Sequence, residues 1–286
     1  IIADVFPGDE GGADLEYVAE EGELLGQLYG LGFERHPETN EIIHQNGLPM
    51  ITEEKVSAGS FQPDLRLGIY NSFTIGNFNI GILFDGQIGG RIYARSHALY
   101  ATGGTITHDD DPNLPISTLD GRTVYSVDYD DNGDPVYTLE QEGGVVGPGL
   151  KWEDLNGDGE INYDTELSEN DVAVEPGGAG YTGYFYNYYG NGFNRDNIEA
   201  ATYDATYFKL RELSIGYTLP NKLFEDSDYI RGARISLIGR NLLLFTNVPT
   251  IDPETYSIRN GIFVNGFEST QLPSTRSFGI NVNLKF

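Results

Sequence analysis

Apolar and polar residues alternate with a period of two in several stretches of the chain. Over residues 64–75, most odd-numbered positions are apolar and most even-numbered positions are polar or small. The alternation resumes after a Gly76-Asn77 pair and is broken once, at Leu83. Because successive side chains of a strand point to opposite faces, this pattern predicts strands with one apolar face. A Gly-Asn pair between two strands indicates a tight turn, so a β-hairpin is expected over 61–90.

The end of the chain shows the clearest alternation. The 11 residues of 276–286 suit a tilted membrane strand, which needs about 9 to 11 residues. Two further stretches, 207–219 and 231–245, alternate less regularly. The first changes phase near Arg211, which predicts a β-bulge there. The apolar positions of the final run are Phe278, Ile280, Val282, Leu284 and Phe286.

Alternation alone fits a soluble β-sandwich as well as a membrane β-barrel, because each has one apolar face. The lengths of the connections separate these two folds. The tight turn is followed by a loop of more than a hundred residues near 91–206, a short link at 220–230 and a loop near 246–275. Short connections that alternate with long ones are typical of bacterial barrels, which have tight periplasmic turns and long extracellular loops.

The predicted fold is therefore all-β: the C-terminal strands of a large antiparallel transmembrane β-barrel with long extracellular loops. We divide the chain into an acidic loop and strand region over 1–60, the hairpin over 61–90, a long extracellular loop over 91–206 and the last barrel strands over 207–286. The predicted strands are too few to close such a barrel, and each unpaired backbone group in lipid costs several kcal/mol. We expect the other strands to come from further sequence or from another chain.

Charge narrows the possible partners. The formal net charge is −27, and the acidic residues lie in two blocks: 13 acidic and 2 basic residues in 1–60, and 21 acidic and 3 basic residues in 101–200. Nucleic-acid binding requires a basic surface, so no nucleic-acid partner is expected. We interpret the acidic blocks as solvated loops. The chain has no Cys, and its longest apolar runs are far shorter than the roughly 18 residues that indicate a membrane helix.

Several short stretches carry a family resemblance. They are LGQLYG at 25–30, FQPD at 61–64, NSF at 71–73, FDGQIGG at 84–90, YFKLRELS at 207–214, GRNL at 239–242, IDPE at 251–254 and PSTRSF at 273–278. In this order, these stretches resemble the C-terminal third of the SusC/RagA family of TonB-dependent outer-membrane transporters from Bacteroidetes. Each stretch alone is weakly specific, and the set is strongly specific.

The resemblance implies a barrel of about 22 strands with an N-terminal plug, an architecture known for outer-membrane transporters. It implies import of an oligosaccharide or a peptide, with a SusD-like surface lipoprotein as a lid and energy supplied by the TonB complex. In the family, the plug and the TonB-contacting segment are N-terminal, and we expect both to lie outside this chain. Phe286, with Phe278, matches the C-terminal aromatic signal for membrane insertion; the alternative is an ordinary aromatic at the lipid interface.

Residues 154–165 have the D-x-N-x-D-G spacing of a calcium-binding loop. Thr165 occupies the twelfth position, where an acidic ligand is usual, with Asp164 and Glu166 on either side. The spacing predicts a Ca2+ site; the alternative is a solvated turn rich in Asp and Asn. Its ligands would be the side chains of Asp154, Asn156 and Asp158, the carbonyl of Glu160, and Asn162 directly or through water.

A run rich in aromatic residues over 181–193 offers flat rings and amide groups on the long loop. Such groups suit sugar rings or extended peptides, so we predict contact with the substrate or the lid. The alternative is that the rings pack the loop against its neighbours. The predicted contact residues are Tyr181, Tyr184, Tyr186, Tyr188 and Tyr189.

No motif supports catalysis, and we predict that the chain is not an enzyme. The four His residues lack metal-ligand spacing and are interpreted as surface imidazoles. Two other functions stay open. A soluble β-sandwich glycan-binding module with a calcium loop would remain soluble without detergent. An outer-membrane barrel enzyme would need a compact external cluster of catalytic side chains.

Overall fold

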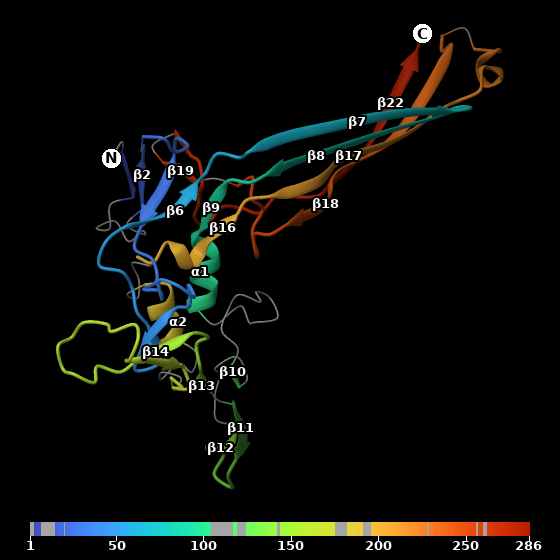
Figure 1. The fold of residues 1–286 in the computed structure, drawn as a ribbon. Coiled ribbons are helices and arrows are strands. Elements are labelled where there is room, and N and C mark those ends of the chain that lie inside the picture. Colours follow the sequence, from blue (N-terminus) through green and yellow to red (C-terminus); the bar gives the residue numbers. More distant parts are fainter. Residues whose placement is uncertain are drawn as a thin grey trace.

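The computed structural model shows a long sheet that extends from a body of shorter elements (Figure 1). Strands make up most of its regular structure, which confirms the predicted all-β class. No helix in the described residues is long and apolar enough to cross a membrane. The structure describes residues 3–6, 15–19, 21–103, 117–118, 124–141, 144–174, 182–190, 196–227, 229–255, 257–259 and 262–286.

Five long strands form the extended sheet, which we call the wall. They are β7 (Leu65–Ile75), β8 (Phe78–Ile88), β17 (Tyr207–Thr218), β18 (Gly232–Thr246) and β22 (Ser277–Lys285). Their order is β22-β18-β17-β8-β7, and each neighbouring pair is antiparallel. β7 and β8 form the expected hairpin around Gly76-Asn77. β7 and β22 are its two edges, so the wall is an open sheet.

The other elements, except η4, form the body and the hairpins attached to it. The strands are β1 (Ala3–Phe6), β2 (Leu15–Val18), β3 (Gln27–Gly30), β4 (Ile43–Gln45), β5 (Leu48–Pro49), β6 (Val56–Ser60), β9 (Arg91–Ala94), β10 (Ser117–Thr118), β11 (Val124–Tyr129), β12 (Pro135–Gln141), β13 (Gly144–Val145), β14 (Leu150–Trp152), β15 (Leu167–Glu169), β16 (Thr202–Asp204), β19 (Ser257–Arg259), β20 (Ile262–Val264) and β21 (Phe267–Glu268). The helices are α1 (Arg95–Thr102), α2 (Thr182–Tyr188) and η3 (Glu199–Ala201), with η4 (Asn221–Phe224) in the link between β17 and β18.

The pairing of the five wall strands places their apolar side chains on the same face of the sheet. One row crosses all five strands through Phe73, Ile80, Ile215, Leu237 and Ile280. Many apolar residues of this face are exposed; the exposed fraction is 49% for Phe73, 57% for Leu237 and 72% for Ile280. In the described structure, therefore, no second layer covers this face.

The opposite face of the wall carries small and polar side chains. The neighbouring row runs through Thr74, Asn79, Gly216, Ser236 and Asn281. Side chains in adjacent rows point to opposite faces of the sheet. The wall therefore has one apolar face and one polar face, as the sequence alternation predicts.

The predicted bulge in β17 is confirmed. The pairing of β17 with β8 shifts between Leu210 and Glu212, which leaves Arg211 as the extra residue relative to β8. On the β18 side, two residues, Asn241 and Leu242, lie opposite Arg211. Opposite it, Asn241 in β18 has φ of 51°, a left-handed conformation that Asn adopts more readily than most residues. The bulge keeps Leu210 and Leu213 on the apolar face, although three positions separate them in sequence.

All short connections of the wall lie at one end. Ile75 pairs with Phe78 at the hairpin turn, and Gly232, just after the β17–β18 link, pairs with Lys285 near the end of β22. The two long connections, 89–206 and 247–276, leave from the other end, where the wall meets the body (Figure 1).

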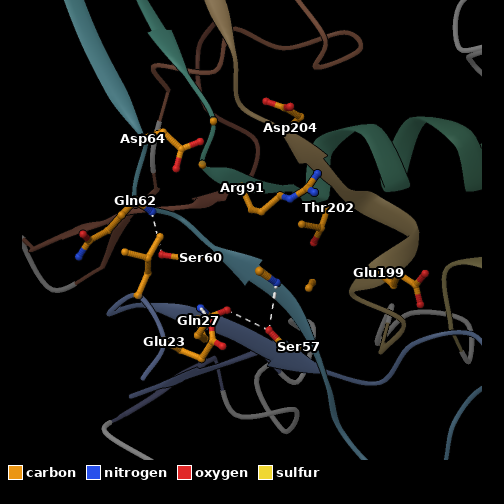
Figure 2. Close-up of a pocket in the computed structure, with 15 residues that line it drawn as sticks. Glu23, Gln27, Ser57, Ser60, Gln62, Asp64, Arg91, Glu199, Thr202 and Asp204 are labelled. Carbon is orange, nitrogen blue, oxygen red and sulfur yellow. Dashed lines mark hydrogen bonds between the residues drawn. The ribbon is translucent and has the colours of Figure 1, made fainter. Parts of the chain in front are cut away.

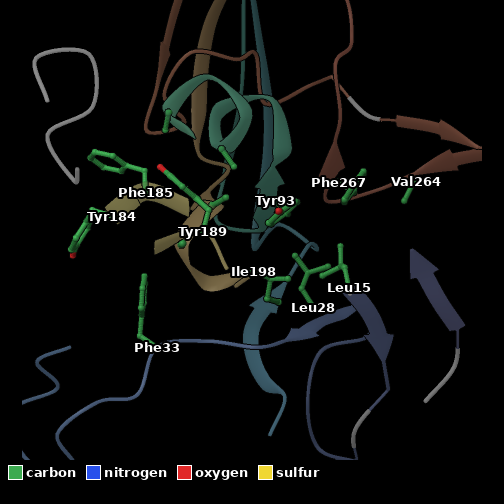
Figure 3. Packing of buried hydrophobic residues seen from close by; sticks show 14 of the residues in the cluster. Leu15, Leu28, Phe33, Tyr93, Tyr184, Phe185, Tyr189, Ile198, Val264 and Phe267 are labelled. Atoms are coloured by element: carbon green, nitrogen blue, oxygen red, sulfur yellow. The ribbon is translucent and has the colours of Figure 1, made fainter. Parts of the chain in front are cut away.

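The hydrophobic core lies in the body and not in the wall. It joins residues from segments far apart in the sequence, including Leu28, Tyr93, Tyr189, Ile198 and Phe267, all of which are buried (Figure 3). Tyr93 and Phe267 stack with ring centroids 5.5 Å apart. The body is therefore a packed unit that brings the two long connections together.

Two of the four His residues contradict the sequence interpretation as surface imidazoles, because His44 and His97 are fully buried. His44 contacts the carbonyl of Leu150 and the hydroxyl of Tyr184. The polar sequence around His44 concealed this burial, because hydrogen bonds to distant residues satisfy its ring.

Replacing Phe267 with Ala should lower the free energy of unfolding by roughly 3 to 5 kcal/mol, because it leaves a cavity in the core of the body. The matched control is Phe263→Ala, since Phe263 lies on the neighbouring hairpin and is 62% exposed. Urea titration of the refolded protein measures both. Equal losses for the two variants would contradict the position of the core.

Candidate functional site

A polar cavity of about 880 Å³ lies where the wall joins the body (Figure 2). It is bordered by β3 and β6, the start of β7, the turn after β8, β9, and the segment from η3 through β16. Its lining residues are Glu23, Leu24, Gln27, Ser57, Ala58, Gly59, Ser60, Gln62, Asp64, Gly89, Gly90, Arg91, Glu199, Thr202 and Asp204. The lining is therefore formed by hydroxyl, amide and charged groups with few apolar side chains.

The Gly89-Gly90 turn shapes the wall side of the cavity. Both residues have positive φ, 75° and 83°, a conformation that Gly adopts without steric cost. A Cβ atom at Gly89 would lie 2.3 Å from Oδ2 of Asp64. The absence of a side chain at Gly89 thus lets the chain turn directly from β8 into β9 and leaves space for the Asp64 carboxylate.

Two of the carboxylates in the cavity are held by the protein itself. Glu199 pairs with the Arg35 guanidinium at 2.7 Å and accepts a hydrogen bond from the backbone N–H of Phe33 at 2.9 Å. Asp204 accepts hydrogen bonds from the backbone N–H and the hydroxyl of Thr206. These bonds fix both carboxylates to neighbouring segments.

Asp64 and Arg91 differ from these two carboxylates. Within the part of the chain that the structure describes, neither side chain has an ion-pair or hydrogen-bond partner. The stem of Arg91 lies over Gly59, where an added Cβ atom would be 3.0 Å from Cγ of Arg91. Asp64 and Arg91 thus leave their bonding capacity unused by the described residues, and a further lining carboxylate, Glu23, accepts only a long bond from Nε2 of Gln27 at 3.5 Å.

A second group of charges lies on the polar face of the wall near the same end. Lys209 of β17 is 2% exposed, and its Nζ lies 2.6 Å from Oδ2 of Asp252 and also contacts Glu254. Arg211, the bulge residue, pairs with Asp85 at 2.6 Å and with Glu254 at 2.7 Å. This ion cluster fastens the connection between β18 and β22 to the polar face of the wall.

The cluster also affects the ionisation of its carboxylates. Burial opposes the charged form of Asp252, but its bonds to the Lys209 ammonium and to the backbone N–H of Glu254 outweigh burial, so its pKa is lowered. For Glu254, burial is likewise outweighed by Lys209 and Arg211, and its pKa is also lowered. A carboxylate with a lowered pKa in the folded state stabilises the fold at neutral pH, and this contribution is lost as the pH falls through that pKa.

The predicted calcium loop is an exposed turn between β14 and β15. Asp154 accepts hydrogen bonds from the N–H groups of Gly157 and Gly159, at 2.6 and 3.1 Å. Asn156 and Asp158 accept from residues two positions further on, at 2.8 Å each. Each oxygen has two lone pairs, so these bonds leave capacity for a cation. Calcium binding stays a prediction, and the solvated turn fits the same bonds.

The rest of the loop contains the predicted ligands Glu160 and Asn162 and the two acidic residues beside the twelfth position, Asp164 and Glu166. Among the described residues, no three His, Asp or Glu side chains gather in a metal-binding arrangement. Glu166 is buried, and its Oε2 accepts bonds from Nε1 of Trp152 at 3.0 Å and from the N–H of Asn162 at 3.2 Å. This oxygen therefore stabilises the turn. Glu160 and Asp164 are exposed.

The predicted aromatic contact residues divide into two groups. Tyr184 and Tyr189 are buried in the core of the body, which favours the packing interpretation for these two rings. Tyr186 and Tyr188 of α2 are partly exposed, and contact with a substrate or lid stays a prediction for them. Tyr181 lies outside the described residues.

The two residues of the predicted insertion signal lie on the edge strand of the wall or directly after it. Phe278 is 79% exposed and Phe286 is 75% exposed. Phe278 belongs to the alternating apolar positions of β22. Their role in membrane insertion stays a prediction.

Sequence reasoning did not identify Asp64 and Arg91 or the ion cluster as functional features. A detectable signal existed for the cluster, because Lys209 and Arg211 interrupt a strand whose other residues alternate between apolar and small or polar. Charged side chains that become buried need partners. No comparable signal marks Asp64 and Arg91, which come from separate segments.

Replacing Lys209 with Met should destabilise the protein by roughly 3 to 5 kcal/mol, because Asp252 loses its buried counter-charge. Lys222→Met is the matched control, since Lys222 is exposed in η4. Stability measured against pH gives a second readout. The wild type should lose stability as the pH falls below the ordinary carboxyl range of about 4, and Lys209→Met should lose less. The same acid dependence in both proteins would contradict the role of the cluster.

The calcium prediction is tested by calorimetric titration of Ca2+ into the wild type and into a variant with Asp154→Asn and Asp158→Asn. Binding heat in the wild type and its loss in the variant are expected, because both substitutions remove charged ligands. Asp130→Asn with Asp134→Asn, in the exposed turn between β11 and β12, provides an acidic control. Absence of binding heat in the wild type would identify the segment as a solvated turn.

Comparison with known proteins gives one match among curated sequences. The chain is 36% identical over 88 residues to TonB-dependent receptor P3 of Formosa agariphila. The aligned segment covers 29% of this chain and 9% of that protein. The chain thus spans a small part of that relative's length. No family model matches the chain.

Among solved structures, the RagAB peptide importer in its open-open state aligns with 95% of this chain and 24% of that chain, at 15% identity and a TM-score of 0.47. Its closed-closed state aligns with 92% of this chain and 23% of that chain, at 16% identity and a TM-score of 0.46. The curated match confirms the resemblance predicted from the sequence: this chain is similar to the TonB-dependent receptors.

Proposed function

We propose that the chain forms part of an outer-membrane transporter that imports an oligosaccharide or a peptide with energy from the TonB complex. The observation that carries this proposal is the two-faced wall. Its apolar face is exposed across five strands, and its polar face meets the ion cluster and the body. A sheet with this distribution fits a barrel wall, with lipid on one side and a polar interior on the other.

The edges of the wall support the same conclusion. β7 and β22 each have a neighbour on one side within the described structure. In lipid, unpaired backbone groups cost several kcal/mol each, so both edges require further strands. We infer that these strands complete a barrel, and that the short connections face the periplasm.

The body then occupies the external end of the barrel, where the two long connections meet. Its packed core gives these connections a fixed shape. We propose that this surface contacts a SusD-like surface lipoprotein, and that the polar cavity lies on the import route. The similarity to a TonB-dependent receptor supports the class of transporter.

The soluble β-sandwich alternative fits the wall less well. A sandwich buries its apolar faces between two sheets. Here Phe73, Leu237 and Ile280 remain exposed, and no described sheet packs against them. No observation favours the barrel enzyme.

The substitution Ile280→Arg should lower the free energy of unfolding by about 2 to 4 kcal/mol if this position lies near the bilayer midplane, because the side chain lies on the apolar face. The matched control is Asn281→Arg, which should be tolerated because Asn281 lies on the polar face. Urea unfolding of protein folded into liposomes measures both. Equal costs at the two positions would refute the membrane placement.

Fractionation of native cells tests the location and the partner. Recovery of the chain in detergent extracts of the outer membrane, together with a surface lipoprotein, is the expected result. Recovery as a free soluble protein would overturn the proposal in favour of the glycan-binding module.

A further inference from the structure

We propose that the cavity between the wall and the body binds a zwitterionic ligand, an amino acid or a short peptide, through Asp64 and Arg91. This inference rests on the proposed import function and selects the peptide class from its two candidate substrates.

The cavity contains charged groups in two different states. Glu199 and Asp204 are held by hydrogen bonds from Arg35, Phe33 and Thr206, so their role in the fold accounts for them. Asp64 and Arg91 face the same cavity, yet they form no ion pair with each other or with another described residue. Both side chains are exposed at the cavity, so a ligand can reach them.

The backbone holds these two groups apart. Asp64 precedes β7 and lies next to Gly89, whereas Arg91 begins β9 and its stem lies next to Gly59. Figure 2 shows the two side chains on separate segments of the cavity lining. A ligand with a carboxylate at one end and an ammonium at the other can satisfy both residues. A guanidinium binds a carboxylate through two parallel hydrogen bonds, and a carboxylate accepts bonds from an ammonium.

The rest of the lining suits a peptide better than a sugar. Gln62 offers an amide group that both donates and accepts hydrogen bonds, as a peptide backbone requires. The polar side chains of Gln27, Ser57 and Thr202 already form hydrogen bonds within the protein. None of the lining residues is aromatic. Sugar rings commonly stack on aromatic faces, and this cavity supplies none.

The two charged contacts predict a specific dependence on the ligand's termini. Removing the ammonium or the carboxylate of the ligand should each weaken binding about tenfold, which corresponds to about 1.4 kcal/mol. Both protein groups are solvent-accessible, so larger effects are not expected.

The experiment measures binding to the complete, detergent-purified transporter by calorimetry. The ligands are trialanine, N-acetyl-trialanine, trialanine amide and maltotriose. The variants are Asp64→Asn and Arg91→Gln, with Glu53→Gln as a control, because Glu53 is exposed and does not line the cavity. Trialanine should bind to the wild type and to the control with the same affinity, and maltotriose should not bind.

The decisive readout is discrimination between ligands. Acetylation should weaken binding about tenfold in the wild type but not in Asp64→Asn, and amidation should do so in the wild type but not in Arg91→Gln. A variant that is merely misfolded would lose affinity for every ligand without this pattern. Retained discrimination in both variants, or binding of maltotriose in place of trialanine, would overturn the proposal.

These outcomes are separate from the test of the import function. A protein that fractionates with the outer membrane and does not bind trialanine refutes the peptide site alone. A protein recovered in the soluble fraction refutes the import function itself.

Discussion

Because each strand presents alternate residues to opposite faces, the wall depends on the register between its neighbouring strands. A shift of one residue would turn every apolar side chain of a strand to the other face. The alternation of apolar and polar residues in β17 slips by one position near Arg211. The bulge at Arg211 compensates for this slip, so the apolar side chains on both sides of it stay on one face. Leu213 and Leu210 would face opposite sides in a regular strand, and the extra residue places both on the apolar face. The lipid-facing surface of the proposed barrel therefore depends on this irregularity, in which Arg211 of β17 lies opposite Asn241 and Leu242 of β18.

The same bulge determines how the connection between β18 and β22 is attached. Arg211 points to the polar face, where it joins Lys209 two positions earlier in the strand. A buried charge without a partner costs several kcal/mol, so the buried Lys209 requires a carboxylate, and the partly exposed Arg211 shares one with it. Asp85 comes from the neighbouring strand, and Asp252 and Glu254 come from the connection itself. Lys209 and Arg211 therefore gain the carboxylates of Asp252 and Glu254 when the connection between β18 and β22 lies against the wall.

The features that the sequence predicted are those with a local periodic signal. Period two located the wall strands, the Gly76-Asn77 pair located the hairpin, and the loss of phase located the bulge. The body has no such signal, because its core joins Tyr93, Tyr189 and Phe267 across long separations in sequence. For the same reason, the aromatic run was interpreted as a contact surface, although Tyr184 and Tyr189 are buried. The cavity could not be predicted, since its lining comes from segments that only the fold brings together.

The position of the cavity follows from short covalent links and not from the long connections. Asp64 directly precedes β7, and Arg91 follows β8 after the Gly89-Gly90 turn, so both groups are fixed to the end of the wall hairpin. Long external loops vary more readily than the strands that carry them. A recognition pair anchored to the wall would therefore keep its spacing while the surrounding loops change. In such an arrangement, the wall sets which termini of a ligand are recognised, and the body sets how much of the ligand between them fits.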